Sequence, residues 1–328
     1  MRWIKRLLLV ITTVFFATTI TFLLIRMMPG DPVENMAISM VRDQGIDYET
    51  AYRSAKAMLN YDPDVPILTQ YIKYLSGLMK GNLGQSLIYK RDVKQIIGEA
   101  LPWTLFVLSI SLLLSFFIGI FLGMYIAWKR TTILDPILSA YTAIVGSIPE
   151  FVIAFLLIVF FSVKLKWFPS RGAYSSSVKP GFNIPFFLDV LDHSILPVAA
   201  YVLGGVGRWA LNMKSNAVSV LGEDYIISAR ARGLGEKRII TKYVGRNAML
   251  PLVTNLAISF GMIFGGSPLI ERLFVYPGVG YYMSQSISSR DYILMQGIFL
   301  MITVTVVLAN LVAEILYSIL DPRIRMEG

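Results

Sequence analysis

The sequence predicts an all-α membrane protein with six transmembrane helices and a small helical subdomain on the outer side of the membrane. Of its 328 residues, 55% are hydrophobic and only 16% are charged, whereas soluble domains carry about a quarter charged residues. Six apolar stretches reach the length of about 20 residues that the hydrocarbon layer requires. Basic residues gather beside these stretches. The bilayer is therefore the expected solvent.

The six predicted spans follow one another along the chain. They lie at residues 7–28, 101–127, 137–163, 194–213, 248–270 and 293–320. The first ends in RMMPGDP rather than in a small-residue cleavage site, which indicates an uncleaved span and not a signal peptide. The third is interrupted by SIPEF, where Pro149 lacks a backbone donor and Glu150 places an acid within the membrane.

The basic residues predict the orientation of the spans. If the spans alternate, the N-terminal segment, the loop with Lys129, the loop between spans four and five and the C-terminal segment share one side. An excess of Lys and Arg in short loops marks the cytoplasmic side, so both termini are expected in the cytoplasm. The same pattern accounts for the net charge of +9. We therefore expect a lipid membrane as the partner of these residues and no nucleic acid.

The spans divide the chain into four regions. The regions are a cytoplasmic N-terminus with the first transmembrane helix (1–28), an extracytoplasmic subdomain (29–100), a five-helix core with a cytoplasmic loop at 219–247 (101–320), and a cytoplasmic tail (321–328). Within the outer subdomain, helices are expected near 48–60 and 66–80.

The loop between spans four and five is longer than a turn requires. The stretch EDYIISARARGLGEKRIITKYVGRNAMLP (223–251) fits two helices, the first ended by Gly233 and the second opened by Gly235. In the first helix, Tyr225, Ile226 and Ala229 share one face at helical spacing. A short helix with an apolar face suits a groove on another protein. The alternative is a basic loop that lies on anionic headgroups.

The sequence contains none of the common motifs for catalysis or cofactor binding. The chain has no cysteine and a single histidine, His193 beside Asp192, for which we expect a structural role. The glycines of ARGLGEKRII lack the spacing of a phosphate-binding loop. We therefore expect no catalytic residue, no metal site and no cofactor bound by this chain. A membrane enzyme and a passive channel remain the alternatives from other classes.

Motifs along nearly the whole chain resemble one family, the permease subunits of bacterial ATP-binding-cassette (ABC) importers, in the oligopeptide/dipeptide/nickel branch. Besides the loop, the motifs are RMMPGDP (26–32), GNLGQSL (81–87), ALPWTLFVL (100–108), SIPEF (147–151), YPGVGYY (276–282), SRDYILMQG (289–297) and DPRIR (321–325). The resemblance implies the type I ABC importer permease fold and the first of two paired permeases, the one with the long outer segment. Two positions depart from the family pattern: Leu211 fills one of two basic positions, and Tyr243 stands where His is frequent.

The resemblance also implies a function and partners. The chain would form half of a pathway for peptide import, with nickel complexes, glutathione or oligosaccharides as alternative cargo. It would work with a second permease, two ATPase subunits that use ATP and Mg, and an extracytoplasmic solute-binding protein, in a bacterial cell membrane. Residues 225–233 would be the coupling helix that docks on an ATPase subunit. The coupling residues are Tyr225, Ala229, Arg230, Ala231, Arg232, Gly233, Arg246, Asn247 and Pro251.

Residues at the break in span three and polar residues within the predicted spans or at their ends, such as Glu271 at the end of span five, are candidates for the translocation pathway, since intramembrane charges are costly. The candidates are Ser147, Pro149, Glu150, Arg208, Glu271 and Glu314. Such residues either offer polar groups to a peptide backbone and its charged termini or pair helices and subunits with one another. The sequence leaves both interpretations open.

Overall fold

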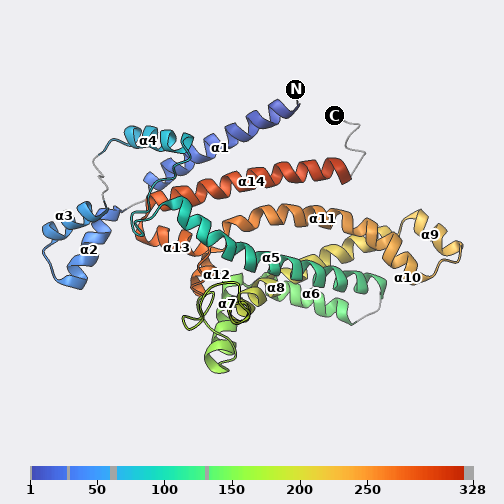
Figure 1. The fold of residues 1–328 in the computed structure, drawn as a ribbon. Helices are drawn as coiled ribbons and strands as arrows, with labels where there is room; N and C mark the ends of the chain where they lie inside the picture. Colours follow the sequence, from blue (N-terminus) through green and yellow to red (C-terminus); the bar gives the residue numbers. More distant parts are fainter. Residues whose placement is uncertain (1, 28–29, 60–64, 130–132, 321–328) are drawn as a thin grey trace. The chain divides into compact units, whose positions relative to one another are not determined.

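The computed structural model describes residues 2–27, 30–59, 65–129 and 133–320 (Figure 1). Within these ranges it is helical apart from turns, the irregular segment 165–183 and one isolated β-bridge. The chain divides into two compact units. The first consists of Met1–Thr104, Phe264–Arg272 and Pro277–Leu308, and the second of Leu105–Ile263, Leu273–Tyr276 and Ala309–Gly328. Two long helices, α5 (Val93–Trp128) and α14 (Tyr292–Leu320), contribute residues to both units.

Among the described residues, five helices are long and apolar enough to cross a membrane, and a sixth span results if one bent pair is counted as a single crossing. The bent pair joins α6 (Leu134–Gly146) to the segment Glu150–Lys164 at an angle of 97°. The bend lies at Pro149, which supplies no N–H and precedes the first residue of α7 (Glu150–Leu157). The predicted interruption of span three is therefore confirmed.

The first unit contains a helical hairpin that sequence reasoning described only in part. Besides its parts of α5 and α14, the first unit contains α1 (Arg2–Arg26), α2 (Pro32–Gln44), α3 (Tyr48–Leu59), α4 (Ile67–Met79), α12 (Pro268–Leu273) and α13 (Val279–Ser289). The helices expected near 48–60 and 66–80 are confirmed as α3 and α4. Helix α2 was missed, although Asp31 caps it by accepting the Val33 N–H at 2.8 Å and Pro32 occupies its first turn. The hairpin of α2 and α3 closes over the buried residues Val33, Ala37, Ala51 and Ala55.

The second unit is built around α8. Helix α8 spans Ile184–Leu221. The other elements of the unit are α6, α7, η1 (Ile158–Lys164), α9 (Asp224–Ala231), α10 (Glu236–Arg238), η2 (Ile239–Val244) and α11 (Gly245–Met262). The short 3-10 turn η3 (Ile263–Gly265) follows α11. Small residues let these helices approach closely: a Cβ on Gly123 of α5 would lie 2.2 Å from the Ala210 carbonyl oxygen of α8. Similarly, a Cβ on Gly207 would lie 2.5 Å from the Thr142 hydroxyl. Small residues at helix contacts are the usual means of packing helices in lipid.

Span five differs from its prediction at both ends. The helical segment runs from Glu236 to Gly265, so it starts twelve residues earlier than 248 and stops before 270. Gly266 then takes a φ of +66°, a left-handed conformation that ends the helix. The chain resumes as the separate short helix α12. The placement of Glu271 at the end of span five is therefore corrected, because the residue lies in α12.

Candidate functional site

The end of α9 is fixed by a glycine turn, as the sequence predicts. Gly233 has a φ of +75°, its N–H donates to the Arg230 carbonyl at 2.9 Å, and the Leu234 N–H donates to the Ala229 carbonyl at 3.2 Å. This pair of hydrogen bonds is a Schellman motif, which satisfies the last carbonyls of a helix. Gly235 then opens α10 with a φ of −61°. The two-helix interpretation of the loop is confirmed.

The apolar face of α9 is turned inward, which corrects the predicted docking face. Ile226 is 0% exposed and Ala229 is 3% exposed. Both belong to one core with residues of α5, α8, η2 and α11, among them Met213 and Val244. A side chain that already fills its own core cannot fill a groove on a partner. The outward side of α9 instead presents Ile227, which is 58% exposed, and Tyr225, which is 41% exposed.

Polar contacts tie α9 to the helices that follow it. The Asn247 side-chain amide donates to the Tyr225 hydroxyl at 3.1 Å, and the Arg230 guanidinium pairs with Glu236 at 2.8 Å. The first pair joins α9 to α11, and the second joins α9 to the start of α10. The remaining coupling candidates, Ala231, Arg232, Gly233, Arg246 and Pro251, are all exposed. The structure therefore brings Tyr225 and Asn247 together and leaves Arg232 and Arg246 exposed. Figure 1 shows α9 and α10 beside each other at one end of the second unit.

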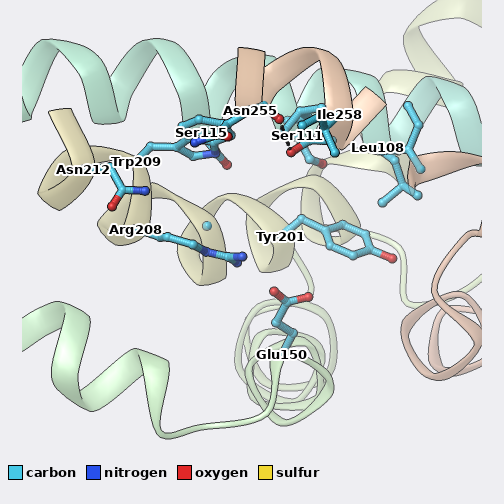
Figure 2. Close-up of a pocket in the computed structure, with 14 residues that line it drawn as sticks. Leu108, Ser111, Ser115, Glu150, Tyr201, Arg208, Trp209, Asn212, Asn255 and Ile258 are labelled. Atoms are coloured by element: carbon cyan, nitrogen blue, oxygen red, sulfur yellow. Dashed lines mark hydrogen bonds between the residues drawn. The ribbon is translucent and has the colours of Figure 1, made fainter. Parts of the chain in front are cut away.

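A cavity of about 410 Å³ lies between α5, α7, α8 and α11 in the second unit. Its polar lining comes from Ser111 and Ser115 of α5, Glu150 of α7, Tyr201, Arg208 and Asn212 of α8, and Asn255 and Ser259 of α11. Figure 2 shows Glu150 pointing from the start of α7 toward the stretch of α8 that carries Tyr201 and Arg208. A second cavity of about 320 Å³, on the α6 side, is also lined by Glu150 and Arg208. Two of the predicted pathway residues thus share one site.

The Glu150 side chain packs closely against α8 because the residue that it meets there, Gly204, has no side chain. A Cβ on Gly204 would stand 3.0 Å from Glu150 Cγ and 3.2 Å from its Oε1. Glu150 and Arg208 are both exposed, and within the described part of the chain neither takes part in an ion pair or side-chain hydrogen bond. Exposed charges at membrane depth are rare unless they face water or a partner. The arrangement offers one acid and one base to a polar molecule in the cavity.

The other pathway candidates are placed differently. Ser147 and Pro149 lie in the break before α7, where the Ser147 hydroxyl donates to the Ala143 carbonyl at 2.7 Å. The side chain of Glu314, in α14, lies outside the part of the chain that the structure describes in detail. Glu271 belongs to the first unit. Among the candidates whose side chains the structure describes, Glu150 and Arg208 are therefore the two that line the cavity.

Glu271 occupies a dense polar cradle of its own. Its carboxylate is 5% exposed and accepts hydrogen bonds from the Ser267 N–H at 3.2 Å, the Tyr281 N–H at 3.1 Å and the Thr104 hydroxyl at 3.2 Å. A Cβ on Gly278 would lie 2.2 Å from Glu271 Oε2, so only glycine fits there. Burial raises the pKa of Glu271 to about 7, although the Tyr281 and Ser267 N–H groups favour the ionised form. Through these hydrogen bonds Glu271 holds the two ends of the 266–281 turn together.

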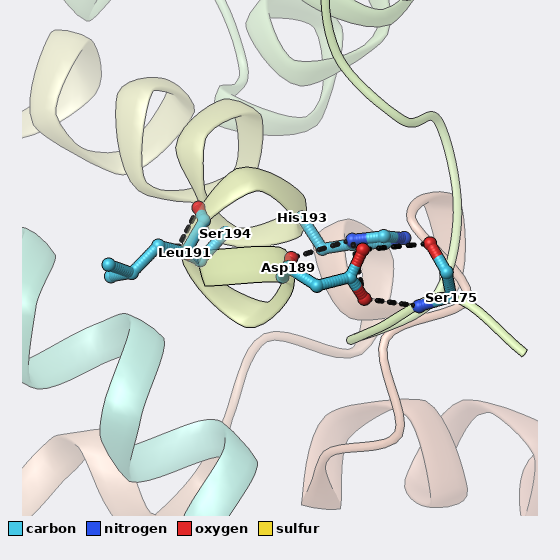
Figure 3. Close-up of polar contacts among 5 residues, drawn as sticks. All are labelled: Ser175, Asp189, Leu191, His193 and Ser194. Carbon is cyan, nitrogen blue, oxygen red and sulfur yellow. Dashed lines mark hydrogen bonds and ion pairs between the residues drawn. The ribbon is translucent and has the colours of Figure 1, made fainter. Parts of the chain in front are cut away.

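Two further buried residues, His193 and Asp291, have structural roles. His193 is buried, and its Nδ1 lies 2.8 Å from the Asp189 carbonyl oxygen, while the Asp189 carboxylate accepts the Ser175 N–H and hydroxyl (Figure 3). The structural role expected for His193 agrees with this setting, although its acidic neighbour is Asp189 rather than Asp192. In the first unit, buried Asp291 accepts the Ser86 hydroxyl at 2.5 Å and the Leu294 N–H at 3.1 Å at the start of α14. Ser86 belongs to the motif GNLGQSL and Asp291 to the motif SRDYILMQG, both noted in the sequence. The contact between them was not predicted, because it joins residues 205 positions apart.

Comparison with known proteins gives a consistent assignment. Residues 119–326 match the family described as "Binding-protein-dependent transport system inner membrane component". The chain is 34% identical to the di/tripeptide transport system permease protein DppB of Pseudomonas aeruginosa, over 98% of this chain and 97% of that protein. It is 32% identical to the oligopeptide transport system permease protein AppB of Bacillus subtilis, over 98% of each chain. It is also 33% identical to the glutathione transport system permease protein GsiC of Escherichia coli, over 98% of each chain.

The helical fold, the apolar spans and the matched motifs define a multi-pass membrane permease and not an enzyme. The chain belongs to the family of binding-protein-dependent transport system inner membrane components. Within that family it is an ABC importer permease of the peptide branch, with the type I permease fold. The resemblance noted from the sequence motifs is thereby confirmed.

Proposed function

We propose that this chain forms one half of the translocation pathway of an ATP-driven importer of short peptides. Its partners are a second permease, two ATPase subunits beneath the membrane and an extracytoplasmic solute-binding protein. The ATPase subunits bind ATP and Mg, and this chain binds no cofactor. The complex resides in a bacterial cell membrane with both termini of this chain in the cytoplasm, which the basic loops support.

Peptide cargo is supported by the names of the relatives and by the cavity. Two relatives carry di/tripeptide and oligopeptide names. A peptide with free ends presents an ammonium group and a carboxylate, which Glu150 and Arg208 of the cavity complement in charge. The serine and asparagine side chains of the same lining offer hydrogen bonds to a peptide backbone. Glutathione, named for GsiC, is a modified tripeptide that meets the same requirements.

The observation that carries the proposal is the single core shared by α9, α8 and α11. Ile226 and Ala229 pack in the same cluster as Met213 of α8 and Leu252 of α11. Packed interiors transmit displacement because they contain few voids. A partner that moves α9 must therefore also move α8, whose residue Arg208 lies on the cavity. Inverting an inward–outward equilibrium from 1:99 to 99:1 requires about 5.5 kcal/mol, which ATP binding to a docked ATPase can supply.

The test changes the outward side of α9 without touching its core. Ile227→Asp places a charge on the exposed surface expected to meet the ATPase, whereas Ile227→Leu keeps the surface apolar. With the full complex in liposomes, we expect the Asp variant to lower ATP-dependent uptake of a labelled tripeptide at least tenfold, or about 1.4 kcal/mol. The Leu variant should transport at the wild-type rate, and both should insert and unfold like the wild type.

Two results would contradict the proposal. Uptake that survives Ile227→Asp would mean that the ATPase grips another part of the chain. Solute flux through the permeases without ATPase subunits would indicate a passive channel. Uptake assays with a tripeptide, a longer peptide and glutathione then define the cargo.

A further inference from the structure

Helix α4 has three distinct faces. Ile67, Tyr71, Tyr74 and Leu78 recur at intervals of three and four residues and form one face. Leu68, Ile72, Leu75 and Met79 form an adjoining apolar stripe, and Thr69, Lys73, Ser76 and the following Lys80 form a polar strip. None of the residues of α4 is fully buried. Among the described residues the first face has a partner, whereas Leu68, Ile72 and Met79 of the stripe are exposed.

The partnered face lies against the first transmembrane helix. The Tyr71 hydroxyl lies 2.7 Å from the Thr19 hydroxyl, and the Phe22 ring packs against Tyr71 and Tyr74 with centroids 5.2 and 5.5 Å apart. Phe22 is only 1% exposed as a result. Figure 1 shows α4 beside α1 in the first unit. Helix α4 is therefore attached to α1 through these side chains.

This contact sets the depth of α4. The span of α1 runs from Leu8 to Arg26, and its last residue stacks on Phe22 and Tyr292. Thr19 precedes Arg26 by seven positions, which places it about 10 Å inside the end of the span at 1.5 Å per residue. Tyr71 reaches that depth, where its hydroxyl and that of Thr19 satisfy each other. A helix attached there does not lie in bulk water.

The apolar stripe of α4 is exposed to a degree similar to that of the outward residues of α1. Leu68 is 68% exposed, Ile72 is 58% exposed and Met79 is 90% exposed. On α1, Phe16 and Ile20 are likewise 58% and 53% exposed within a span that is predominantly exposed. Lys73 and Lys80 lie on the strip next to the stripe, as in helices that rest at the boundary between headgroups and acyl chains.

We propose that α4 is an interfacial membrane helix, whose stripe of Leu68, Ile72 and Met79 inserts into the outer-leaflet lipid while Lys73 and Lys80 face the phosphate groups. Helix α4 thereby differs from the water-exposed α2–α3 hairpin of the same outer segment. The lipid surface anchors α4 beside α1. This inference depends on membrane insertion of the chain and not on its cargo or its ATPase, so failure of the transport proposal leaves it intact.

The absence of cysteine from the sequence makes the test direct, because single-cysteine variants carry one nitroxide label each. Leu68→Cys and Ile72→Cys report on the stripe, and Lys73→Cys is the matched control on the polar strip. Phe16→Cys serves as the lipid reference and Arg53→Cys, whose native side chain is 77% exposed on α3, as the water reference. The full-length chain is reconstituted in nanodiscs of phosphatidylethanolamine and phosphatidylglycerol, and collisions with oxygen and with a water-soluble nickel chelate are measured.

We expect the labels at positions 68 and 72 to collide with oxygen as the Phe16→Cys label does, and with the chelate about tenfold less than the Lys73→Cys label. Chelate collisions equal to those at Arg53→Cys would place the stripe in water and overturn the proposal. Protection from both reagents, with or without the companion permease present, would show that protein covers the stripe and would also overturn it. Helix content by circular dichroism confirms that each variant is folded.

Discussion

At the scale of single residues, Glu150 and Arg208 are distinguished by where their charges lie. Most charged residues of the chain flank the apolar helices, whereas these two line cavities between α7 and α8. A glycine makes room for Glu150, since a Cβ on Gly204 would press on its side chain. An unpaired charge within a membrane protein is costly to keep. The cost is consistent with a role in holding a charged solute.

The charge of Glu150 can be removed with little change in shape. Glu150→Gln keeps the side-chain length but cannot attract an ammonium group, so we expect transport of peptides with a free N-terminus to fall about tenfold. Transport of N-acetylated peptides should change little. The matched control is Ser147→Ala, which removes a hydroxyl that bonds only within its own helix. Uptake assays of both peptide types check the prediction, and equal losses for both would point to a structural role of Glu150.

Two glycines of the α9 turn form a second matched pair. A Cβ would meet nothing within 4 Å at either Gly233 or Gly235, but Gly233 has a φ of +75° and Gly235 has a φ of −61°. Gly233→Ala should therefore cost about 1–2 kcal/mol of backbone strain, and Gly235→Ala should cost little. We expect hydrogen–deuterium exchange of the α9 amides to become about tenfold faster in Gly233→Ala only. Similar exchange in the two variants would mean that the turn does not hold the helix.

At the scale of elements, α12 and α13 illustrate how a short turn is held by one buried acid. Glu271 on α12 accepts N–H groups from both ends of the 266–281 turn, and the glycines of YPGVGYY let the backbone close around it. The carboxylate accepts hydrogen bonds from backbone N–H groups of the turn, which would otherwise need water as their acceptor. Its pKa is raised to about 7 because burial disfavours the charge. The turn should therefore respond to pH.

The sign of that response follows from proton binding. Between the ordinary pKa of 4.5 and the raised value of about 7, the folded state binds more protons than the unfolded state. The stability contributed by Glu271 is thus complete below pH 4.5 and decreases as the pH rises through 7, by on the order of 3 kcal/mol. Glu271→Gln, which cannot ionise, should unfold with much less pH dependence. Thermal unfolding of both proteins at pH 5, 6, 7 and 8 measures this, and parallel pH profiles would contradict it.

The helix boundaries show which local sequence signals are sufficient to predict where a helix begins or ends. Gly233 and Pro149 were placed correctly because they act on their own backbone, through a left-handed φ and a missing donor. Helix α2 could have been found from Asp31 and Pro32, which form a common helix start. The helix opened by Gly235 was predicted separately from span five at 248, because the polar residues Thr241 and Lys242 separate the two apolar patterns; the structure joins them in one segment, Glu236–Gly265.

At the scale of the whole molecule, a membrane solvent explains the distribution of apolar side chains. Large apolar residues such as Phe117 and Phe121 of α5 are 63% and 72% exposed. They would be a liability in water and are ordinary in lipid. The buried clusters occur instead where helices meet, and the largest of the second unit surrounds the attachment of α9. The loop that carries α9 is therefore packed against the helices of this unit and is not a loose connection.

The interpretation of α9 shows the limit of periodicity. Tyr225, Ile226 and Ala229 do lie at helical spacing, but spacing alone does not tell whether an apolar face meets a partner or the chain's own core. Ile226 and Ala229 are internal and Ile227 is outward. The difference is decided by η2 and α11, which return along the loop and cover that face.

The sequence by itself determined the apolar spans, the basic loops beside them, the glycine end of α9 and the family. These features depend on composition, on backbone constraints at single residues and on motif order, all of which are local. The tertiary structure alone decided that Glu150 and Arg208 share a cavity, that Glu271 is buried in a turn, and that Ser86 meets Asp291. Such contacts depend on which distant segments the folded chain brings within a few ångströms of each other.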